Sequence, residues 1–403
     1  MVVRVARPHD VAAAGALTAE AYLADGLLDG EDAYTGELRD AARRAQEAVL
    51  LVAVAPTPAG GEAVVGSLTL APYGSSYAEI AEPAELELRM LAVAPEVRGR
   101  GIAARLMRAA LREALARGAR RVVLSTLDAM ATAQRLYARL GFVPQPDRDW
   151  GHENVRLHVF TWTPEAAPGA PVELATWPPL RTVVTQDGWR AGMSNGFTQR
   201  ANSALPQRST ENLAGAVARV EAVYEGAGLP ALIRVDSGGP EALGDLLLAR
   251  GYEERSLTDV VVRPVGEPAA AVAGIHVSDE PDDAWLCAWL GVKAPLTDLA
   301  LARAVLEGAP ASYLTAVASG QVVGTVRVAV TEGWAALSCL AVDPHARRGG
   351  LGRALTDQAL RVAAEHGAAR AFLQVVDANP AAQTLYAGMG FRLADTYRYL
   401  AGR

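Results

Sequence analysis

The spacing of apolar and polar residues predicts alternating strands and helices over the first 165 residues. Period-two alternation and short apolar runs indicate strands, whereas apolar residues three and four positions apart indicate helices. We expect strands at 2–6, 48–55, 63–72, 85–93, 122–126 and 154–162, and helices at 8–23, 31–47, 102–117 and 131–140. Strands and helices that alternate in this order predict an α/β layer with a central sheet.

A glycine-bearing loop joins the fourth predicted strand to the helix that follows it. Glycines let backbone N–H groups approach an anion closely, and the start of a helix adds unpaired donors and a positive dipole end. The loop is therefore a candidate phosphate site, although a tight connection would look similar. Its candidate binding residues are Leu91, Ala92, Val93, Arg98, Gly99, Arg100, Gly101, Ile102 and Ala103.

The same pattern recurs 249 residues later without a gap. Tyr137 falls on Tyr386, and the pair Gly141-Phe142 falls on Gly390-Phe391. A repeat that keeps loop glycines and a helical tyrosine in one register predicts that residues 273–403 repeat the fold of residues 1–165. The candidate binding residues of the second loop are Leu340, Ala341, Val342, Arg347, Arg348, Gly349, Gly350, Leu351 and Gly352.

A shift of 110 residues from the first copy indicates a fainter third copy at 175–265. Gly251-Tyr252 falls on Gly141-Phe142, but Glu211 stands where Gly101 would be. A carboxylate at that place opposes anion binding. We therefore predict a shortened, non-catalytic segment that lacks the phosphate loop, with proline-rich linkers at 164–171 and 264–269.

The composition fits a soluble globular protein and narrows the partners. The 403 residues suggest two to three domains, and the net charge of −7 argues against nucleic acid as the main partner. The two cysteines and six histidines show no disulfide framework or metal-ligand spacing, so no metal is expected. No apolar run has the length of a membrane span or the form of a signal peptide. We expect a cytoplasmic monomer or homodimer without a membrane partner.

The two intact copies resemble the GNAT superfamily of N-acetyltransferases. The resemblance rests on Arg98-x-x-Gly101-x-Ala103 followed by Leu136-Tyr137-x-x-x-Gly141-Phe142, and on their duplicates near the C-terminus. It covers most of 1–165 and 273–403. It implies tandem folds, each a twisted, mostly antiparallel sheet flanked by helices. It also implies that acetyl-CoA is the cosubstrate and that a small-molecule or protein amine accepts the acetyl group.

The resemblance further implies how the thioester is polarised. In such enzymes a main-chain N–H near the end of the fourth strand, here about Ala92–Val93 or Ala341–Val342, stabilises the developing oxyanion. Tyr137 and Tyr386 are the corresponding candidates to protonate the departing thiolate, and a half-buried core tyrosine is the alternative. Asn379 also matches the pattern, whereas its counterpart in the first copy is Met130.

Glu87 is a candidate general base on the fourth strand. Some members of this superfamily carry at this place the carboxylate that deprotonates the attacking ammonium, whose pKa is about 10.4 for a lysine-like amine. The alternative is a solvated charge, like Glu85 two residues earlier. Ala336 occupies the matching place in the C-terminal copy, so a base there must come from elsewhere or the amine must arrive unprotonated.

The sequence thus predicts an acetyl-CoA-dependent N-acetyltransferase that transfers the acetyl group by direct attack of an amine on the thioester. Two alternatives stay open. One is a tandem enzyme similar to mycothiol synthase, and the other is a non-catalytic acyl-CoA-binding regulator.

Overall fold

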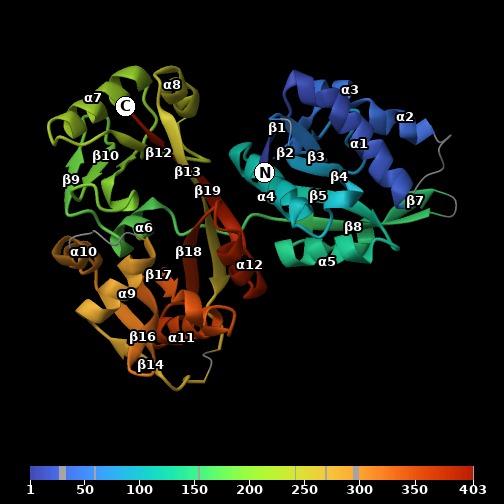
Figure 1. Ribbon diagram of the computed structural model, residues 1–403. Helices are drawn as coiled ribbons and strands as arrows, with labels where there is room; N and C mark the ends of the chain where they lie inside the picture. Colours follow the sequence, from blue (N-terminus) through green and yellow to red (C-terminus); the bar gives the residue numbers. More distant parts are fainter. Residues whose placement is uncertain are drawn as a thin grey trace. The chain divides into compact units, whose positions relative to one another are not determined.

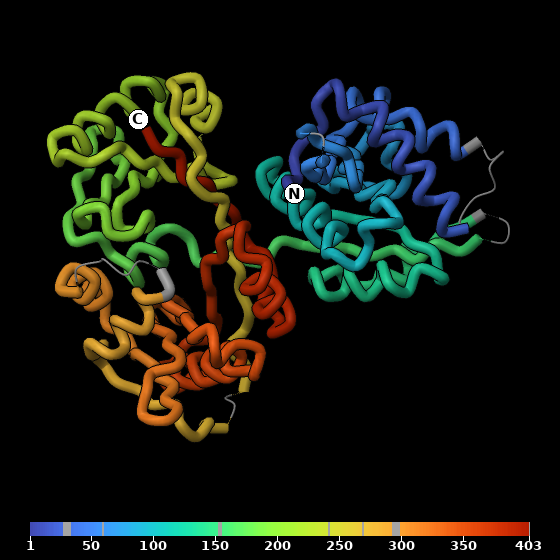
Figure 2. Tube along the Cα trace, viewed as in Figure 1, coloured from blue at the N-terminus to red at the C-terminus, as the bar shows by residue number. Residues whose placement is uncertain are grey.

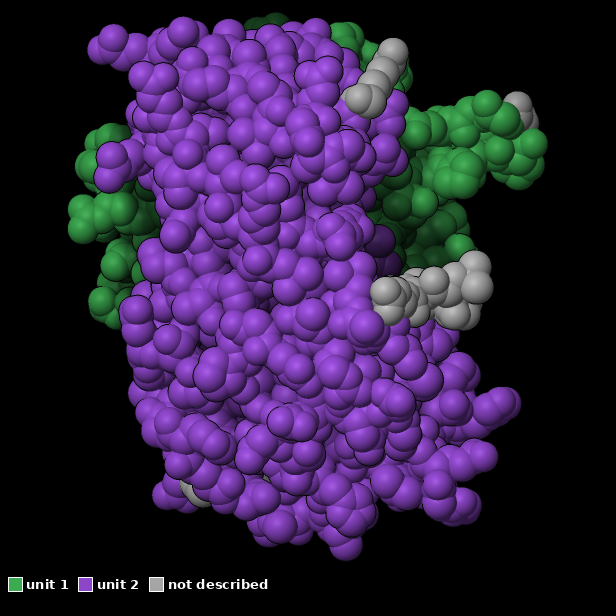
Figure 3. Space-filling model, turned by 90° about the vertical axis from the view of Figure 1, so that its left-hand side faces the viewer, with its two compact units in different colours: residues 1–164 green, residues 165–403 purple. Residues whose placement is uncertain are grey.

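The chain folds into two compact units, Met1–Pro164 and Glu165–Arg403. They are coloured separately in Figure 3. The computed structural model describes residues 1–26, 33–58, 60–152, 155–240, 242–267, 270–293 and 299–402. Within these ranges, no helix combines the length and the apolar character that crossing a bilayer requires.

Unit 1 is one twisted sheet with helices on its faces (Figure 1). The main strand order is β1-β2-β3-β4-β5-β8-β6, and β7 pairs with β8. Its strands are β1 (Val2–Val5), β2 (Val49–Pro56), β3 (Glu62–Pro72), β4 (Glu85–Val93), β5 (Arg121–Leu127), β6 (Val143–Pro144), β7 (Trp150–His152) and β8 (Val155–Trp162). Its helices are α1 (Val11–Ala24), α2 (Ala33–Arg39), α3 (Ala41–Glu47), α4 (Ile102–Ala116) and α5 (Ala131–Leu140).

Only the β4–β5 pair of this sheet is parallel among the described strands. The predicted α/β class and the mostly antiparallel sheet are therefore confirmed. The predicted helix at 31–47 is wrong in one respect, since it divides into α2 and α3. The Asp40 side chain accepts the Arg43 N–H at 3.1 Å and caps α3, which starts a new helix there.

Unit 2 holds the middle and C-terminal segments in one 11-stranded sheet of order β14-β15-β16-β17-β18-β13-β19-β12-β11-β10-β9. Its strands are β9 (Arg181–Val184), β10 (Arg190–Met193), β11 (Ala204–Leu205), β12 (Leu232–Asp236), β13 (Glu253–Pro264), β14 (Ile275–Ser278), β15 (Ser312–Ala318), β16 (Gln321–Thr331), β17 (Trp334–Val342), β18 (Arg370–Val376) and β19 (Arg392–Ala401). Its helices are α6 (Ala170–Thr176), α7 (Leu213–Glu225), α8 (Leu243–Ala249), α9 (Asp283–Lys293), α10 (Leu299–Leu306), α11 (Leu351–Glu365) and α12 (Pro380–Gly388).

The last strands of the middle and C-terminal segments are exchanged. In unit 1 the last strand, β8, pairs with β5. In unit 2 the corresponding neighbour of β18 is β13, from the middle segment, and the C-terminal strand β19 lies between β13 and β12. Figure 2 shows the red end of the chain running in among the green and yellow elements. Each segment therefore completes the sheet of the other.

Helix α6 connects the two halves of unit 2 and begins within the predicted linker at 164–171. Pro171 lies in its first turn, where a missing N–H costs nothing. The buried Glu173 carboxylate pairs with Arg234 of β12 at 2.5 Å and accepts from Gln374 of β18 at 2.6 Å. The fully buried Arg327 donates to the Thr176 carbonyl at 3.0 Å and so binds the C-terminal end of α6.

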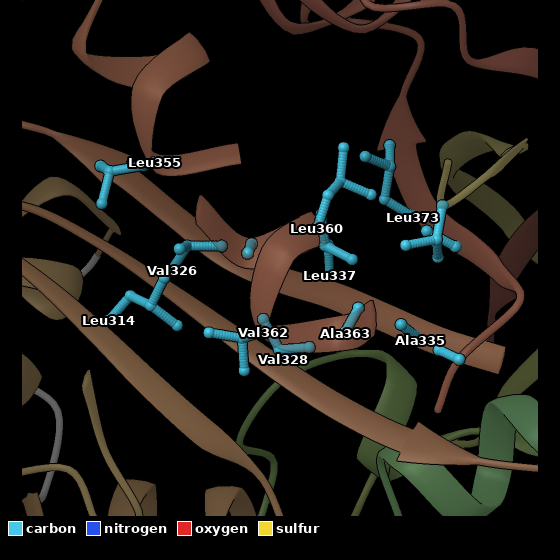
Figure 4. Packing of buried hydrophobic residues seen from close by; sticks show 14 of the residues in the cluster. Leu314, Val326, Val328, Ala335, Leu337, Leu355, Leu360, Val362, Ala363 and Leu373 are labelled. Carbon is cyan, nitrogen blue, oxygen red and sulfur yellow. The ribbon is translucent and has the colours of Figure 1, made fainter. Parts of the chain in front are cut away.

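The largest apolar cluster of unit 2 lies between α11 and the strands β15 to β18 (Figure 4). Leu355 of α11 and Leu314 of β15 are fully buried there. Helix α11 lies so close to β16 that a Cβ on Gly324 would lie 2.7 Å from the Leu355 side chain, which only glycine avoids. This packing fixes the start of α11 over the sheet, where the glycine loop ends.

The strand exchange predicts that the two halves of unit 2 lose structure together. Leu247→Ala in α8 removes a fully buried side chain from the core of the middle segment and should lower the free energy of unfolding by about 2–5 kcal/mol. Native-state hydrogen exchange should then accelerate at amides of both β12 and β18. The neighbouring, half-exposed Leu248→Ala is the control. Wild-type exchange rates at β18 in the Leu247 variant would contradict this expectation.

Candidate active site

Two adjacent parallel strands separate in each unit at the place where the glycine loop follows. The β4–β5 pairing covers only Glu85 to Leu88 of β4, and the β17–β18 pairing covers only Trp334 to Ala336 of β17. Beyond these residues the strand ends diverge, and no described strand pairs with the freed edge. Backbone groups along that edge are open to a ligand that can form strand-like hydrogen bonds.

A β-bulge marks the same register position in both diverging strands. Met90 and Cys339 have left-handed backbones, with φ of 56° at each. The ladder to β3 jumps between Ser67 and Thr69, and the ladder to β16 jumps between Thr325 and Arg327. The extra residue of a bulge is unpaired, and the left-handed residue lies two or three positions before the predicted oxyanion donors at 92–93 and 341–342.

The two glycine loops share their backbone geometry. Helices α4 and α11 begin after Gly101 and Gly350, whose φ values are 76° and 85°, and no side chain caps either helix start. The first backbone N–H groups of these helices are therefore available to an anion. Helix α7 of the middle segment differs, because the Asn212 side chain accepts the Gly215 N–H at 2.9 Å. Its start is already capped, which fits the predicted loss of the phosphate loop.

Arg348 occupies a left-handed position that glycine occupies in the first copy. Its φ is 64°, against 76° for Gly99. A side chain in this conformation costs on the order of 1 kcal/mol or more, so its presence indicates a local role. Arg348 lines the cavity described below, where a guanidinium can reach a bound phosphate.

The observed contacts of Arg98 and Arg347 stabilise the two glycine loops. Each arginine donates its Nε–H to the backbone carbonyl of the last residue of the preceding strand, Val93 at 3.2 Å and Val342 at 3.0 Å. Arg98 also pairs with Asp25 of α1 at 2.5 Å. These bonds fold the loop back against the strand end, a role that the expectation of direct phosphate contact did not include.

A cavity of about 1040 Å³ opens between the separated ends of β17 and β18. All predicted binding residues of the second glycine loop except Gly349 line this cavity, together with residues of β17, β18 and α12. Further lining residues come from the middle segment and from β19. They are Trp177, Thr198, Gln199, Arg200, Thr258, Tyr397 and Tyr399. The middle segment thus forms one wall of the C-terminal cleft.

Tyr386 lines this cavity, and its ring contacts Phe391 with centroids 5.6 Å apart. Tyr137 packs similarly against Phe142 and Phe160. Burial raises the pKa of Tyr137 to about 12 and raises that of Tyr386 further. Both phenols stay protonated near neutral pH. With a thiol pKa of about 8.5, proton transfer from Tyr137 to a thiolate is uphill by about 5 kcal/mol in the resting site.

Asn379 lines the same cavity, but its amide oxygen accepts the Ala382 N–H at 3.1 Å and caps α12. Its observed role is to begin that helix. Ala336 is buried, and among the described residues that line the cavity none is Asp or Glu. A carboxylate base is therefore absent from this described lining.

Glu87 is fully buried, so the alternative of a solvated charge is wrong, as it is for the nearly buried Glu85. The Oε2 atom of Glu87 accepts three consecutive backbone N–H groups, from Glu79, Ile80 and Ala81, at 2.8 to 3.1 Å. Burial raises its pKa despite these bonds. The carboxylate holds the segment before β4 in place. A raised pKa is also what a general base requires, and the catalytic role stays a prediction.

Two family models match the chain. The model described as probable histone acetyltransferase Rv0428c C-terminal matches residues 172–400, which is more than half of the chain, and the model described as acetyltransferase (GNAT) family matches residues 19–142. The chain belongs to the GNAT superfamily. Within it, the chain belongs to the Rv0428c C-terminal family through residues 172–400.

Solved structures similar to this GNAT chain share little sequence with it. A GCN5-related N-acetyltransferase from Kribbella flavida is 16% identical over 55% of this chain and 89% of its own, with a TM-score of 0.44. One from Sphaerobacter thermophilus is 16% identical over 100% of this chain and 95% of its own, with a TM-score of 0.34.

A third similar structure is the putative acetyltransferase yncA from Salmonella typhimurium, solved with its cofactor acetyl-CoA. It is 21% identical over 42% of this chain and 98% of its own, with a TM-score of 0.31. No curated protein matches the chain in sequence.

Sequence reasoning missed the wall that the middle segment contributes to the C-terminal cleft. Asn202 organises this wall through four bonds. Its side chain accepts the Ser194 and Gly196 N–H groups at 2.7 and 2.9 Å and donates to the Phe197 and Thr198 carbonyls at 2.6 and 2.8 Å. Residues 198–203 belong to the middle segment, and their position over the cleft depends on the strand exchange, which the sequence pattern does not show.

Arg348→Gly should raise the stability of the protein but weaken its binding of acetyl-CoA. Glycine relieves the left-handed strain, so the free energy of unfolding should rise by up to about 1 kcal/mol, while loss of the guanidinium should weaken acetyl-CoA binding about 10-fold. Calorimetry and denaturant unfolding measure the two effects. Ser319→Gly, at φ of 51° in the β15–β16 turn, should gain stability alone. Unchanged affinity of the Arg348 variant would exclude a phosphate contact.

Glu87 and Glu85 should show opposite pH dependences of stability. The pKa of Glu87 is raised mainly by burial, so its stabilising contribution is full at low pH and is lost as pH rises through its folded pKa. Glu87→Gln should thus gain stability relative to the wild type from pH 4 to 7.

For Glu85, burial raises the pKa, but the Arg148 and Arg121 guanidiniums and the Glu82 N–H together lower it. Its contribution is present above about pH 4.5 and lost as pH falls. Relative to the wild type, Glu85→Gln should therefore lose stability as pH rises toward about 4.5 and stay level above that pH. Denaturant unfolding at several pH values checks both, and slopes of equal sign would contradict the assignment.

Proposed function

We propose that the protein is an acetyl-CoA-dependent N-acetyltransferase and that unit 1 and the C-terminal half of unit 2 each bind the cosubstrate. The observation that carries the proposal is the cavity between β17 and β18. It brings the glycine loop, the freed edge of β17 and Tyr386 to one space. Unit 1 repeats the loop, the bulge and the strand divergence.

The geometry supports a direct transfer. The pyrophosphate would lie on the uncapped starts of α4 and α11, and the pantetheine arm would pair with the freed strand edge. The amine nitrogen then attacks the thioester carbon, the carbon–sulfur bond breaks, and the thiolate takes a proton. We expect backbone N–H groups just after the bulge to bind the developing oxyanion.

Tyr386 and Tyr137 are the proposed proton donors to the thiolate. Their raised pKa values keep the phenols protonated but make transfer to the thiolate uphill in the resting site, a cost that the bound reactants must offset. In unit 1, Glu87 would accept the proton from the attacking ammonium. In unit 2, the described lining offers no carboxylate, so the amine would enter that site unprotonated or lose its proton to water.

A negative charge introduced at each loop glycine tests acetyl-CoA binding and shows which unit is active. Calorimetry should find two acetyl-CoA sites per wild-type chain. Gly101→Glu and Gly350→Glu should each remove one, because a carboxylate repels the pyrophosphate at the helix start. Thiol release with a panel of amines then shows which variant loses activity. Glu211 already places a carboxylate at the matching position of the middle segment.

Circular dichroism of both variants controls for folding. Fewer than two sites in the wild type would contradict the two-site proposal. Binding without thiol release to any amine would instead favour the non-catalytic acyl-CoA-binding alternative. The substrate class could still be that of a mycothiol-synthase-like enzyme, which an aminosugar-linked cysteine in the panel would show.

A further inference from the structure

Arg200 reaches the C-terminal cleft from the middle segment. It lies in the short helical turn Arg200–Asn202 and lines both the main cavity and a neighbouring cavity of about 290 Å³. Its guanidinium carbon lies 5.0 Å from the centre of the Trp177 ring. Among the described residues, no carboxylate forms an ion pair with it. An arginine stacked on an aromatic ring with its N–H groups free is ready to bind an anion.

The charges of the cleft favour the same kind of ligand. Its described lining contains four arginines and no acidic residue. Arg347, Arg348 and Arg353 belong to the glycine loop and the start of α11, where the cosubstrate phosphates would bind. Arg200 belongs to a different wall, together with Trp177 and Tyr399. The cleft therefore has a second cationic position that the cosubstrate loop does not account for.

The wall around Arg200 is held rigidly. The four side-chain bonds of the buried Asn202 fix residues 194–198, and Gln199 accepts a hydrogen bond from Ser256 of β13 at 2.9 Å. Thr198 is held at a φ of 60°. A loop fixed in this way presents Arg200 at a defined place, which is a property of binding sites more than of mobile surface loops.

Aromatic rings surround Arg200 in this wall. Trp177, the ring that its guanidinium faces, is 5% exposed, and its indole N–H is buried away from the cavity. Trp289, Tyr397 and Tyr399 add apolar ring surface to the same cavity. This wall therefore sets one cationic donor, Arg200, in an aromatic surface.

We propose that the acceptor bound by the C-terminal cleft is a primary amine that also carries an anionic group, a carboxylate or a phosphate monoester, which Arg200 binds. The proposal rests on the proposed acetyl transfer and names its substrate class. It disfavours a lysine within a polycationic peptide as the acceptor at this cleft, since such a peptide would meet arginines without a neutralising carboxylate.

Matched pairs of amines test the proposal in the Gly101→Glu chain. Because this variant should not bind acetyl-CoA in unit 1, the measured acetylation comes from the C-terminal cleft. The pairs are phenylalanine with phenethylamine, and O-phosphoethanolamine with ethanolamine. The anionic member of at least one pair should have the higher kcat/KM. Arg200→Ala should raise its KM about 10- to 100-fold with little change in kcat, and should leave the neutral amine unaffected. The favoured pair identifies the anionic group.

The controls separate this inference from the proposed function. Arg190→Ala removes an arginine that lines only the smaller cavity and should behave as the parent chain. Arg200→Lys should retain part of the preference. Calorimetric binding of N-acetylphenylalanine and O-phosphoethanolamine, which Arg200→Ala should weaken, reads the anion site without turnover. Acetyl-CoA binding shows that each variant is folded.

Equal use of both members in both pairs, or an equal loss for both in Arg200→Ala, would overturn the inference while acetyl transfer stood. A lysine-rich peptide acetylated at the same rate by the parent and the Arg200 variant would overturn it as well. Absence of thiol release from the wild-type chain with every amine would refute the proposed function instead, whereas its absence from the Gly101→Glu chain alone would assign turnover to unit 1. The binding measurement would then still decide whether Arg200 holds an anion.

Discussion

The exchange of β13 and β19 is the constraint on which unit 2 depends. In unit 1 the last strand, β8, pairs with β5 of the same segment. In unit 2, β13 of the middle segment pairs with β18 of the C-terminal segment, and β19 of the C-terminal segment pairs with β12 of the middle segment. A sheet edge without its partner strand exposes a row of unpaired N–H and C=O groups. The exchange therefore binds the middle and C-terminal segments through their hydrogen-bond ladders. It also brings α6 and the 194–202 loop to the cleft between β17 and β18.

The cleft itself begins where the ladder between β17 and β18 ends, at Ala336, and the bulge at Cys339 lies three residues further along β17. A left-handed residue inside a strand bends the chain within the separated stretch. The same device recurs at Met90 in unit 1. The β17–β18 hydrogen-bond ladder ends before β17 does, which leaves one edge of β17 unpaired. The cavity lies along that edge, and the glycine loop follows at the end of the strand. The site is thus formed mainly by backbone geometry, and side chains such as Tyr386 are added to it.

Much of this organisation could be predicted from the sequence, because periodicity and glycine placement are local signals. Most strands and helices of unit 1 agree with those signals, with the exception of the helix predicted at 31–47, which divides into α2 and α3. The strand exchange could not be predicted, because β13 reads as the same apolar run whichever sheet it joins. The burial of Glu87 could not be predicted either, because alternation cannot show that residues 79–81 fold over it. Arg200 had no signal of its own.

The exchange also has an evolutionary consequence. After a duplication, a phosphate loop that no longer binds a nucleotide can drift freely, as Glu211 and the Asn212 cap illustrate, because no ladder runs through it. The strands of the same copy have no such freedom, since β13 is part of its neighbour's sheet. A redundant enzyme copy can in this way be retained as architecture. It can then acquire a new task by forming one wall of its neighbour's cleft.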